Sequence, residues 1–332
     1  MKPFQIHGWT GETSAAAVAR RRAWVALMCA LVFAGTPRTL WSQGAPPVAP
    51  PPASQNASPM VEHTRVHERI TPRELAGTKR TFDGPMGKPV ELFIPSGTTA
   101  RDGLRLVIHF LGAPFIPELA VSQLGTGYLV AVVSIGAGSG LYDRAFSDPA
   151  VYDSLRASIS REASAALGQP ARITHVTLSG FSAGHGAIRA ILRDSSHFAE
   201  VDGVLLLDGL HTSYVPEGTV LDKGGTLDER NLEVWVRYGM AAMRGEKRFL
   251  ITHSEIFPGT FASTTETTDY LVNKFGLART PVLKWGPRGL QQLSEARRGG
   301  LEIMGFAGNS APDHIDQFQG MPEFLRQVEG RK

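Results

Sequence analysis

A serine between two glycines stands where an apolar stretch gives way to residues that favour a helix. Residues 173–178 predict a buried parallel strand, and residues 187–192 continue with good helix formers. A Gly-x-Ser-x-Gly sequence at such a corner is typical of a nucleophile whose hydroxyl is raised above the edge of a sheet. Gly180 and Gly184 suit the corner, because a side chain at either position would collide with the neighbouring strand or helix. We therefore predict that Ser182 is a nucleophile.

Strands and helices alternate over most of the chain and indicate how this corner is held. An antiparallel hairpin is expected within residues 79–95, at one edge of a sheet. Apolar runs predict strands at 104–110, 128–134, 173–178, 204–208, 249–253 and 301–306, and helices are expected at 148–167, 229–243 and from about 322. Strands that alternate with helices imply a mostly parallel sheet with right-handed crossovers.

An insertion, residues 211–248, separates the strand at 204–208 from the next one. Binding sites of such sheets lie over the carboxyl ends of the strands, where an insertion is placed to act as a lid or a pocket wall. Trp235, in the helix expected within the insertion, fits ordinary packing equally well.

With its parts in this order, the chain resembles the α/β-hydrolase superfamily over residues 78–328, and in particular its serine esterases and lipases. The resemblance implies an α/β fold, with a mostly parallel sheet, helices on both faces and a lid-like insertion after the sixth strand. In that family the nucleophile follows the fifth strand and the catalytic histidine follows the last, which corresponds here to Ser182 and His314. No cofactor is expected.

His314 is the histidine that this arrangement selects. It alone among the ten histidines lies in a loop directly after the final predicted strand, residues 301–306. In the family such a histidine removes the serine proton during attack and returns it to the leaving group.

The acid that orients the histidine has two candidates. Asp208 ends an apolar run, which places it at the carboxyl end of the sixth strand, and is our choice. Glu255 follows the seventh strand and is the alternative, with Glu266 and Asp269 further along. Either carboxylate would fix the imidazole tautomer and stabilise the imidazolium.

An oxyanion that forms on the substrate needs two preorganised donors. The backbone N–H of Ala183 is the first, by the geometry of the corner. The second is expected from the turn after the strand at 104–110, where Pro114 has no N–H. That leaves Ala113 as the predicted donor and Leu111 as its reserve.

Other histidines lie near predicted strand ends, but their spacing matches no standard metal set. We predict no metal site, and we expect these histidines to form supporting hydrogen bonds. The four histidines are His109, His185, His211 and His253. His63 and His67 lie four residues apart with no third ligand nearby, and we expect them to be solvated.

Composition narrows the classes of protein further. A chain of 332 residues that is 42% hydrophobic and 20% charged suits one α/β domain. The net charge is only +3, and several basic residues lie near the N-terminus, so no nucleic-acid partner is expected. The single cysteine, Cys29, lies in the apolar leader, so we predict neither disulfides nor a thiol nucleophile.

The N-terminal region has the form of an export signal. Three arginines at 20–22 precede an apolar run too short to span a bilayer comfortably, which predicts a signal peptide over residues 1–42. Residues 43–77 are expected to form a proline-rich linker and N-terminal extension, and residues 78–332 the catalytic domain. We expect a periplasmic or secreted protein without a stable membrane span after cleavage. An uncleaved anchor is the alternative.

The sequence thus predicts an exported serine hydrolase that acts on a small-molecule carboxylic ester through an acyl-enzyme. An amidase or peptidase with the same triad is one alternative, because the triad does not fix the leaving group. A catalytically silent binding protein on the same fold is another. The oligomeric state is not indicated.

Overall fold

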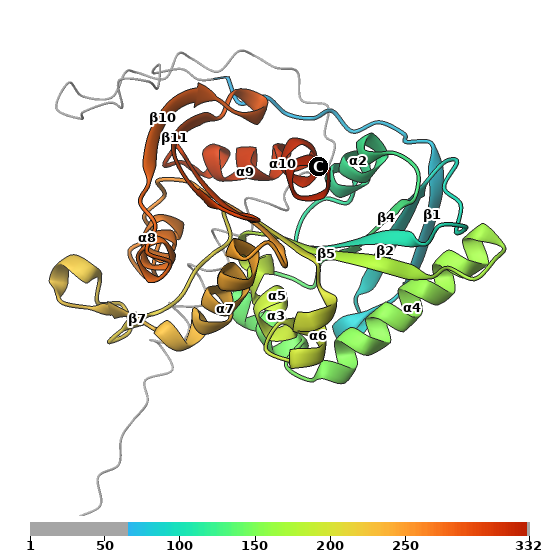
Figure 1. The fold of residues 1–332 in the computed structure, drawn as a ribbon, viewed down its shortest axis with the longest axis horizontal. Helices are drawn as coiled ribbons and strands as arrows, with labels where there is room; N and C mark the ends of the chain where they lie inside the picture. Colours follow the sequence, from blue (N-terminus) through green and yellow to red (C-terminus); the bar gives the residue numbers. More distant parts are fainter. Residues whose placement is uncertain (1–65, 331–332) are drawn as a thin grey trace, which may run out of the picture. The chain divides into compact units, whose positions relative to one another are not determined.

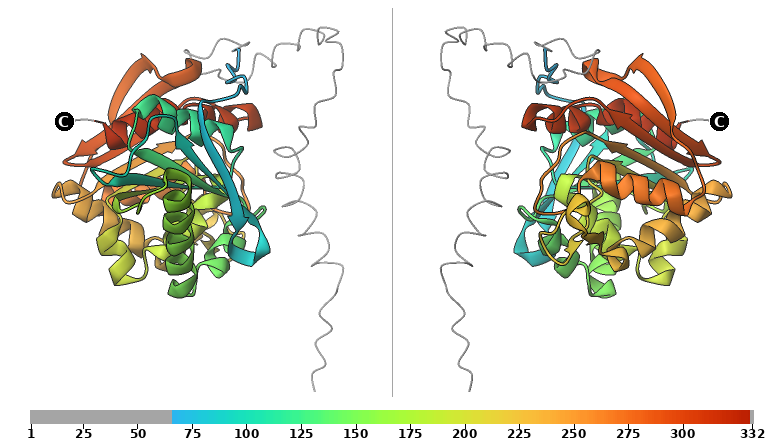
Figure 2. Two further views of the ribbon diagram at one scale, coloured as in Figure 1. Left: turned by 90° about the vertical axis from the view of Figure 1, so that its right-hand side faces the viewer. Right: turned by 90° about the vertical axis from the view of Figure 1, so that its left-hand side faces the viewer.

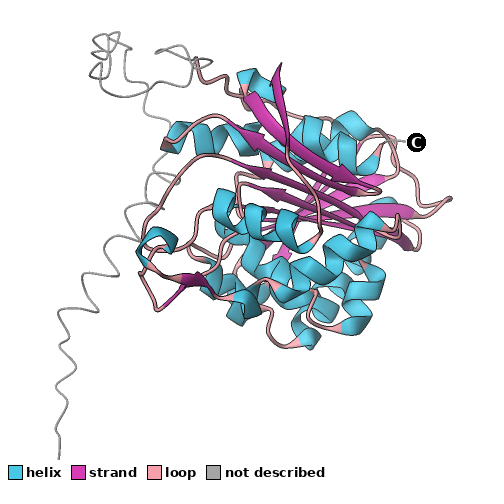
Figure 3. Cartoon of the chain, turned by 60° about the vertical axis from the view of Figure 1, so that its left-hand side comes forward, coloured by secondary structure: helices cyan, strands magenta, loops and turns pink. Residues whose placement is uncertain are grey.

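The computed structural model describes residues 66–330, in which a ten-stranded sheet lies between two layers of helices (Figures 1 and 3). The strands of this sheet are β1 (Gly77–Asp83), β2 (Pro89–Pro95), β3 (Leu104–Phe110), β4 (Tyr128–Val133), β5 (Ile173–Phe181), β6 (Gly203–Leu207), β9 (Arg248–His253), β10 (Thr280–Trp285), β11 (Gln291–Arg298) and β12 (Leu301–Phe306). The helices are α2 (Phe115–Leu124), α3 (Ser139–Ala145), α4 (Pro149–Leu167), α5 (His185–Ile191), α6 (Ser195–Glu200), α7 (Glu233–Met243), α8 (Thr264–Lys274), α9 (Ala311–Gln319) and α10 (Met321–Glu329).

A helix that crosses a membrane must be long and apolar, and no helix within residues 66–330 meets both conditions. The predicted signal peptide, residues 1–42, lies outside the described residues.

The strand order is β1-β2-β4-β3-β5-β6-β9-β12-β11-β10. The six central strands, from β4 to β12, run parallel to one another, whereas β2 and β1 at one edge and β11 and β10 at the other are added in antiparallel pairings. The predicted edge hairpin is confirmed as β1 and β2, and the predicted parallel strands are confirmed with nearly the expected bounds. This mostly parallel sheet, with its serine corner after the fifth strand, has the α/β-hydrolase fold.

At the opposite edge, β10 and β11 extend the sheet beyond the predicted strands. Almost every residue of β10 is exposed, and its register with β11 shifts between Pro281 and Lys284. Because an exposed and irregular edge strand has no apolar alternation, the sequence pattern gave no signal for it.

Both faces of the sheet are apolar, because successive residues of a strand point to opposite sides. Ile108 belongs to the core beneath α3, α4, α5, α7 and α8, whereas its neighbour Val107 belongs to the core beneath α2, α9 and α10. Figure 2 shows the two layers from either side, with α9 and α10 in red across the sheet from the green and orange helices. The continuous apolar runs in the sequence are explained by this double burial.

The insertion at 211–248 contains a small hairpin, β7 (Tyr214–Val215) with β8 (Thr226–Leu227), followed by α7. Trp235 of α7 is fully buried, and its ring stacks on Phe249 of β9 at 6.0 Å. The helix therefore covers the sheet, and of the two roles considered for Trp235 the structure shows ordinary packing.

Candidate active site

The candidate nucleophile stands in a strained turn. Strand β5 ends at Phe181, the short 3₁₀ turn Ser182–Gly184 follows, and α5 begins at His185. The φ angle of Ser182 is +50°, a left-handed value that side-chain-bearing residues seldom adopt. Such strain persists only where the surroundings enforce it, and it concentrates at functional sites.

Close backbone contacts enforce this turn and require its two glycines. A Cβ on Gly184 would lie 2.2 Å from the carbonyl oxygen of Phe110 in β3. A Cβ on Gly180 would lie 3.0 Å from the carbonyl carbon of Gly184. The expected collision is confirmed for Gly184, whereas at Gly180 a side chain would be tight and its neighbours would have to give by a few tenths of an ångström.

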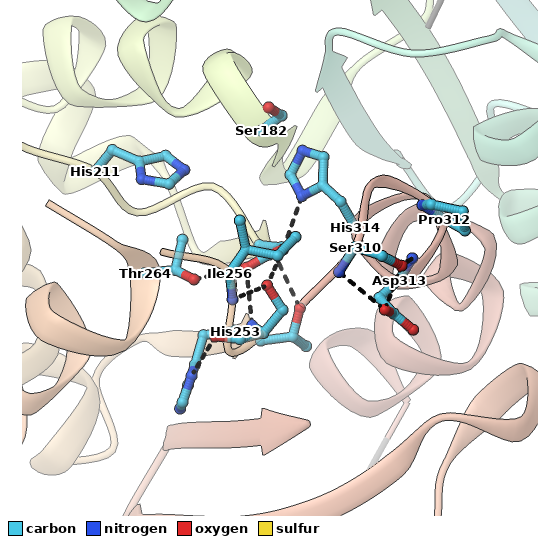
Figure 4. A network of polar contacts seen from close by, with 12 residues as sticks. Ser182, His211, His253, Ile256, Thr264, Ser310, Pro312, Asp313 and His314 are labelled. Carbon is cyan, nitrogen blue, oxygen red and sulfur yellow. Dashed lines mark hydrogen bonds and ion pairs between the residues drawn. The ribbon is translucent and has the colours of Figure 1, made fainter. Parts of the chain in front are cut away.

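His314 and Asp208 form a hydrogen-bonded pair beside this turn. The Nδ1–H of His314 donates to Oδ2 of Asp208 over 2.7 Å, although the residues are 106 positions apart in the chain. The imidazole also packs on Phe181, with ring centroids 4.6 Å apart. With Nδ1 engaged, Nε2 is the nitrogen left for the serine, and Figure 4 shows the ring between Ser182 and the polar network. No hydrogen bond joins the Ser182 hydroxyl to His314 in the described residues.

His314 lies in the first turn of a helix, and the prediction that it lies in a loop is wrong. Helix α9 begins at Ala311 because Ser310 and Asp313 form a capping box, in which each side chain accepts from the other's backbone N–H. Pro312 occupies the first turn, where its missing N–H costs nothing. The sequence Ser-x-x-Asp with this proline was the signal for the helix start.

Asp208 is buried in a set of donors that keep it ionised. Its φ is +44°, and its carboxylate accepts from the Ser254 N–H at 2.9 Å, the Ser254 hydroxyl at 2.7 Å and the Thr264 hydroxyl at 2.7 Å. Burial alone would raise the pKa of Asp208, but the bonds from His314, Ser254 and Thr264 outweigh it and hold the pKa well below its ordinary range.

The other candidate acids are engaged elsewhere. Glu255 accepts from the Gly308 N–H at 3.2 Å, Glu266 binds the Tyr214 hydroxyl and caps α8, and Asp269 accepts from Arg279. Ser254 and Thr264, which hold this acid, carry no sequence signal for that role. The capping box from Ser263 to Glu266 could have placed Thr264 at a helix start, but no pattern directs either hydroxyl to Asp208.

The two predicted oxyanion donors lie at the ends of adjacent strands. Ala183 follows Ser182 in the turn, and Ala113 is an exposed residue just after β3. The Ala113 N–H has no acceptor within residues 66–330. The reserve donor, Leu111, gives its N–H to the carbonyl of Val133 at 3.1 Å, so that group is already used within the sheet.

The four histidines near the strand ends form hydrogen bonds within the protein. His109 receives the Ser179 hydroxyl at 3.0 Å and donates to the Leu111 carbonyl, and burial lowers its pKa to about 3. His185 donates to the Ser182 carbonyl, His211 to the Ala262 carbonyl, and His253 receives Arg279. Burial, with Arg279 as the second cause, lowers the pKa of His253 to about 4, and burial also lowers the pKa values of His185 and His211. These rings therefore stay neutral at neutral pH.

One group in the described residues has the spacing of a metal site. His67, Asp313 and Asp316 bring three potential ligand atoms within 4.8 Å of one another. However, the Arg69 guanidinium already binds Asp316, and Asp313 caps α9. A cation would compete with the positive charge of Arg69, so the arrangement suits an ion-pair network better. His67, expected to be solvated, instead donates to Asp316 at 2.8 Å.

Comparisons with known proteins find similarity of fold. No family model and no curated protein matches the chain. Among solved structures, a mutant of the feruloyl esterase module from Clostridium thermocellum in complex with sinapinate is 12% identical, with a TM-score of 0.46, over 80% of this chain and 96% of that one. Esterase 2 from Thermogutta terrifontis, phosphorylated by paraoxon, is 14% identical, with a TM-score of 0.44, over 79% and 98%. An acylaminoacyl peptidase from Pyrococcus horikoshii is 14% identical, with a TM-score of 0.40, over 77% and 43%. These similarities are distant, and the strand order and the serine corner define the fold independently of them.

Proposed function

We propose that the chain is a serine hydrolase that cleaves carboxylic esters through an acyl-enzyme on Ser182. The observation that carries the proposal is the pair of His314 and a buried, ionised Asp208, packed against the residue that precedes the strained serine. A carboxylate at Nδ1 keeps Nε2 unprotonated, which is the form that can accept a serine proton.

In the proposed reaction, the Ser182 oxygen attacks the ester carbonyl while Nε2 of His314 takes its proton. Asp208 stabilises the resulting imidazolium, and the N–H groups of Ala183 and Ala113 donate to the oxyanion. Loss of one such donor typically costs about 3 kcal/mol of transition-state stabilisation. The imidazolium then protonates the leaving alcohol. Water next attacks the acyl-enzyme while Nε2 of His314 takes its proton, and that proton passes to the Ser182 oxygen as the bond to the acyl group breaks and the acid leaves.

An apolar part of the substrate would find aromatic surface near this site. The loop after β9 is tied to Asp208 through Ser254, and it carries Phe257 and Phe261, whose exposed fractions are 60% and 37%. The ring of Phe261 packs edge-on against His211 at 5.0 Å. We infer that this loop, together with the hairpin of the insertion, forms the wall of the substrate pocket.

The test is covalent labelling of the full-length protein with a fluorophosphonate, which reacts with an activated serine. Wild type should be labelled, and Ser182→Ala should lose labelling and lose turnover of p-nitrophenyl esters by about 10⁴- to 10⁶-fold. Folded wild type that resists labelling would favour a binding protein. Faster cleavage of matched anilides than of esters would favour an amidase.

We also propose that the protein is exported, on the basis of the arginines at 20–22 and the apolar run that follows them. N-terminal sequencing of protein from the periplasm or medium should find a start near residue 43. Full-length protein retained in the cytosol would contradict export, and full-length protein in the membrane fraction would favour the uncleaved anchor.

A further inference from the structure

The first described residues cross the helix that carries the candidate histidine. His67 Nδ1 lies 2.8 Å from Oδ2 of Asp316, and the Arg69 guanidinium binds the other carboxylate oxygen. Arg69 also donates to the Pro312 carbonyl at 3.2 Å. The backbone N–H of Ile70 donates to the Gln319 side chain at 2.7 Å. Residues 67–70, hereafter the strap, thus contact α9 from its first turn to its last.

Asp316 makes this contact electrostatically important. Its side chain is fully buried, and it lies two residues from His314 on the same short helix. A buried carboxylate without compensating charge is strongly destabilising, so the Arg69 guanidinium and the hydrogen bond from His67 stabilise α9 in its observed place. Ile70 and Leu75 add apolar contact with the core on this face of the sheet.

The position of α9 in turn fixes the candidate site. Phe318, one turn beyond His314, stacks on His109 at 5.2 Å and on Phe181 at 5.1 Å. A Cβ on Gly112 would lie 2.4 Å from the Phe318 ring, so α9 also abuts the oxyanion turn. Because a misplacement of about 1 Å in a catalytic group can cost about 10²-fold in rate, small movements of α9 matter.

We propose that the strap positions His314 through α9, with Arg69 as the positioning residue. The proposal rests on the proposed hydrolase function. Arg69 touches neither Ser182 nor Asp208, so its effect on turnover passes through Asp316 and the helix.

The experiment compares full-length wild type with Arg69→Met, using p-nitrophenyl ester kinetics and the rate of fluorophosphonate labelling. We expect kcat and the labelling rate to fall about 10- to 100-fold in the variant, with KM changed less than about threefold. Arg73→Met is the matched control, because Arg73 is exposed and makes no hydrogen bond or ion pair within residues 66–330. The control should match wild type.

A second substitution separates positioning from packing. In Arg69→Met with Asp316→Asn, no buried charge is left without its guanidinium, so we expect kcat to recover at least severalfold relative to Arg69→Met. Absence of recovery, or an Arg69→Met variant with wild-type kcat, would overturn the proposal that the strap positions His314. If Arg69→Met fails to fold, Arg69→Lys decides, because an ammonium cannot hold Asp316 and the Pro312 carbonyl with the fixed fork of a guanidinium. Wild-type kcat in that folded variant would count against the proposal.

If wild type is labelled at Ser182 and Arg69→Met has unaltered kinetics, only the positioning role of the strap is rejected. If wild type is not labelled, both the hydrolase function and the positioning role are rejected.

Discussion

Asp208 is a carboxylate kept charged inside the protein by hydrogen bonds in place of water. The carboxylate accepts three hydrogen bonds from Ser254 and Thr264, and a fourth from the imidazole of His314. A carboxylate in this state does not titrate near neutral pH, so it offers a constant negative charge to an imidazolium formed during catalysis.

Replacing Asp208 by asparagine tests this role directly. The amide cannot stabilise an imidazolium and favours the wrong imidazole tautomer, so we expect kcat to fall about 10⁴-fold. Glu255→Gln should stay within about threefold of wild type, because the Glu255 side chain is bound to Gly308. Steady-state ester hydrolysis, with circular dichroism as the check on folding, measures both. A larger loss in Glu255→Gln would make Glu255 the acid.

Some residues of the candidate site could be predicted from the sequence, and others could not. Asp208 was identifiable because it ends an apolar run, and Ser182 because glycines flank it. Ser254 and Thr264 were not, since a hydroxyl carries no sequence signal for the distant carboxylate that it will bind. The left-handed φ angle of Leu111 was equally hidden, because leucine seldom adopts that region.

The site lies at the ends of three neighbouring strands, and each strand is followed by a residue with a left-handed φ angle. These residues are Leu111 after β3, Ser182 after β5 and Asp208 after β6, on strands adjacent in the sheet. The turns lie so close that a Cβ on Gly209 would come within 2.7 Å of the Ser182 carbonyl oxygen. The site is therefore an arrangement of mutually supporting corners.

Gly184→Ala should break this arrangement. Its Cβ would meet the backbone of Phe110, which cannot move without shifting the strand, so we expect a loss of about 1–3 kcal/mol in stability together with lower turnover. Gly140→Ala is the matched control, because Gly140 is exposed in α3 and its nearest neighbour is the flexible Arg144 side chain at 3.4 Å. The control should be neutral or slightly more stable. Equal melting temperatures and activities for the two variants would contradict the close-packed corner.

Elements with strong periodicity were predictable, and those fixed by tertiary contacts were not. Helix α4 was recognisable from Leu155, Ile159 and Ala163, which are spaced four apart and are buried. The start of α9 was missed, although its capping box is written in the sequence, because an apolar stripe is weak in so short a helix. The docking of the strap onto α9 depends on Asp316, which only the folded chain brings to Arg69.

A buried carboxylate near the end of the described residues joins the last helix to two central strands. Glu329 of α10, whose side chain is fully buried, accepts from Arg105 of β3 at 2.7 Å and from the Thr177 hydroxyl of β5, with His175 3.5 Å away. It thereby joins the last helix to the two strands that lead to the oxyanion turn and the serine corner. Burial alone would raise the pKa of Glu329, but these partners outweigh it and lower the pKa from 4.5 to about 2.

Glu329→Gln should therefore reveal a pH-dependent part of the stability. Because the folded pKa is depressed, the stabilisation is fully present above pH 4.5 and is lost as the pH falls towards 2. The shift corresponds to a contribution of about 3 kcal/mol. Urea unfolding between pH 2 and pH 7 should show wild type more stable than the variant above pH 5, with the difference closing in acid. Glu74→Gln, at an exposed residue, should follow wild type throughout. A difference for Glu329→Gln that stays constant with pH would mean that shape, and not charge, gives Glu329 its role.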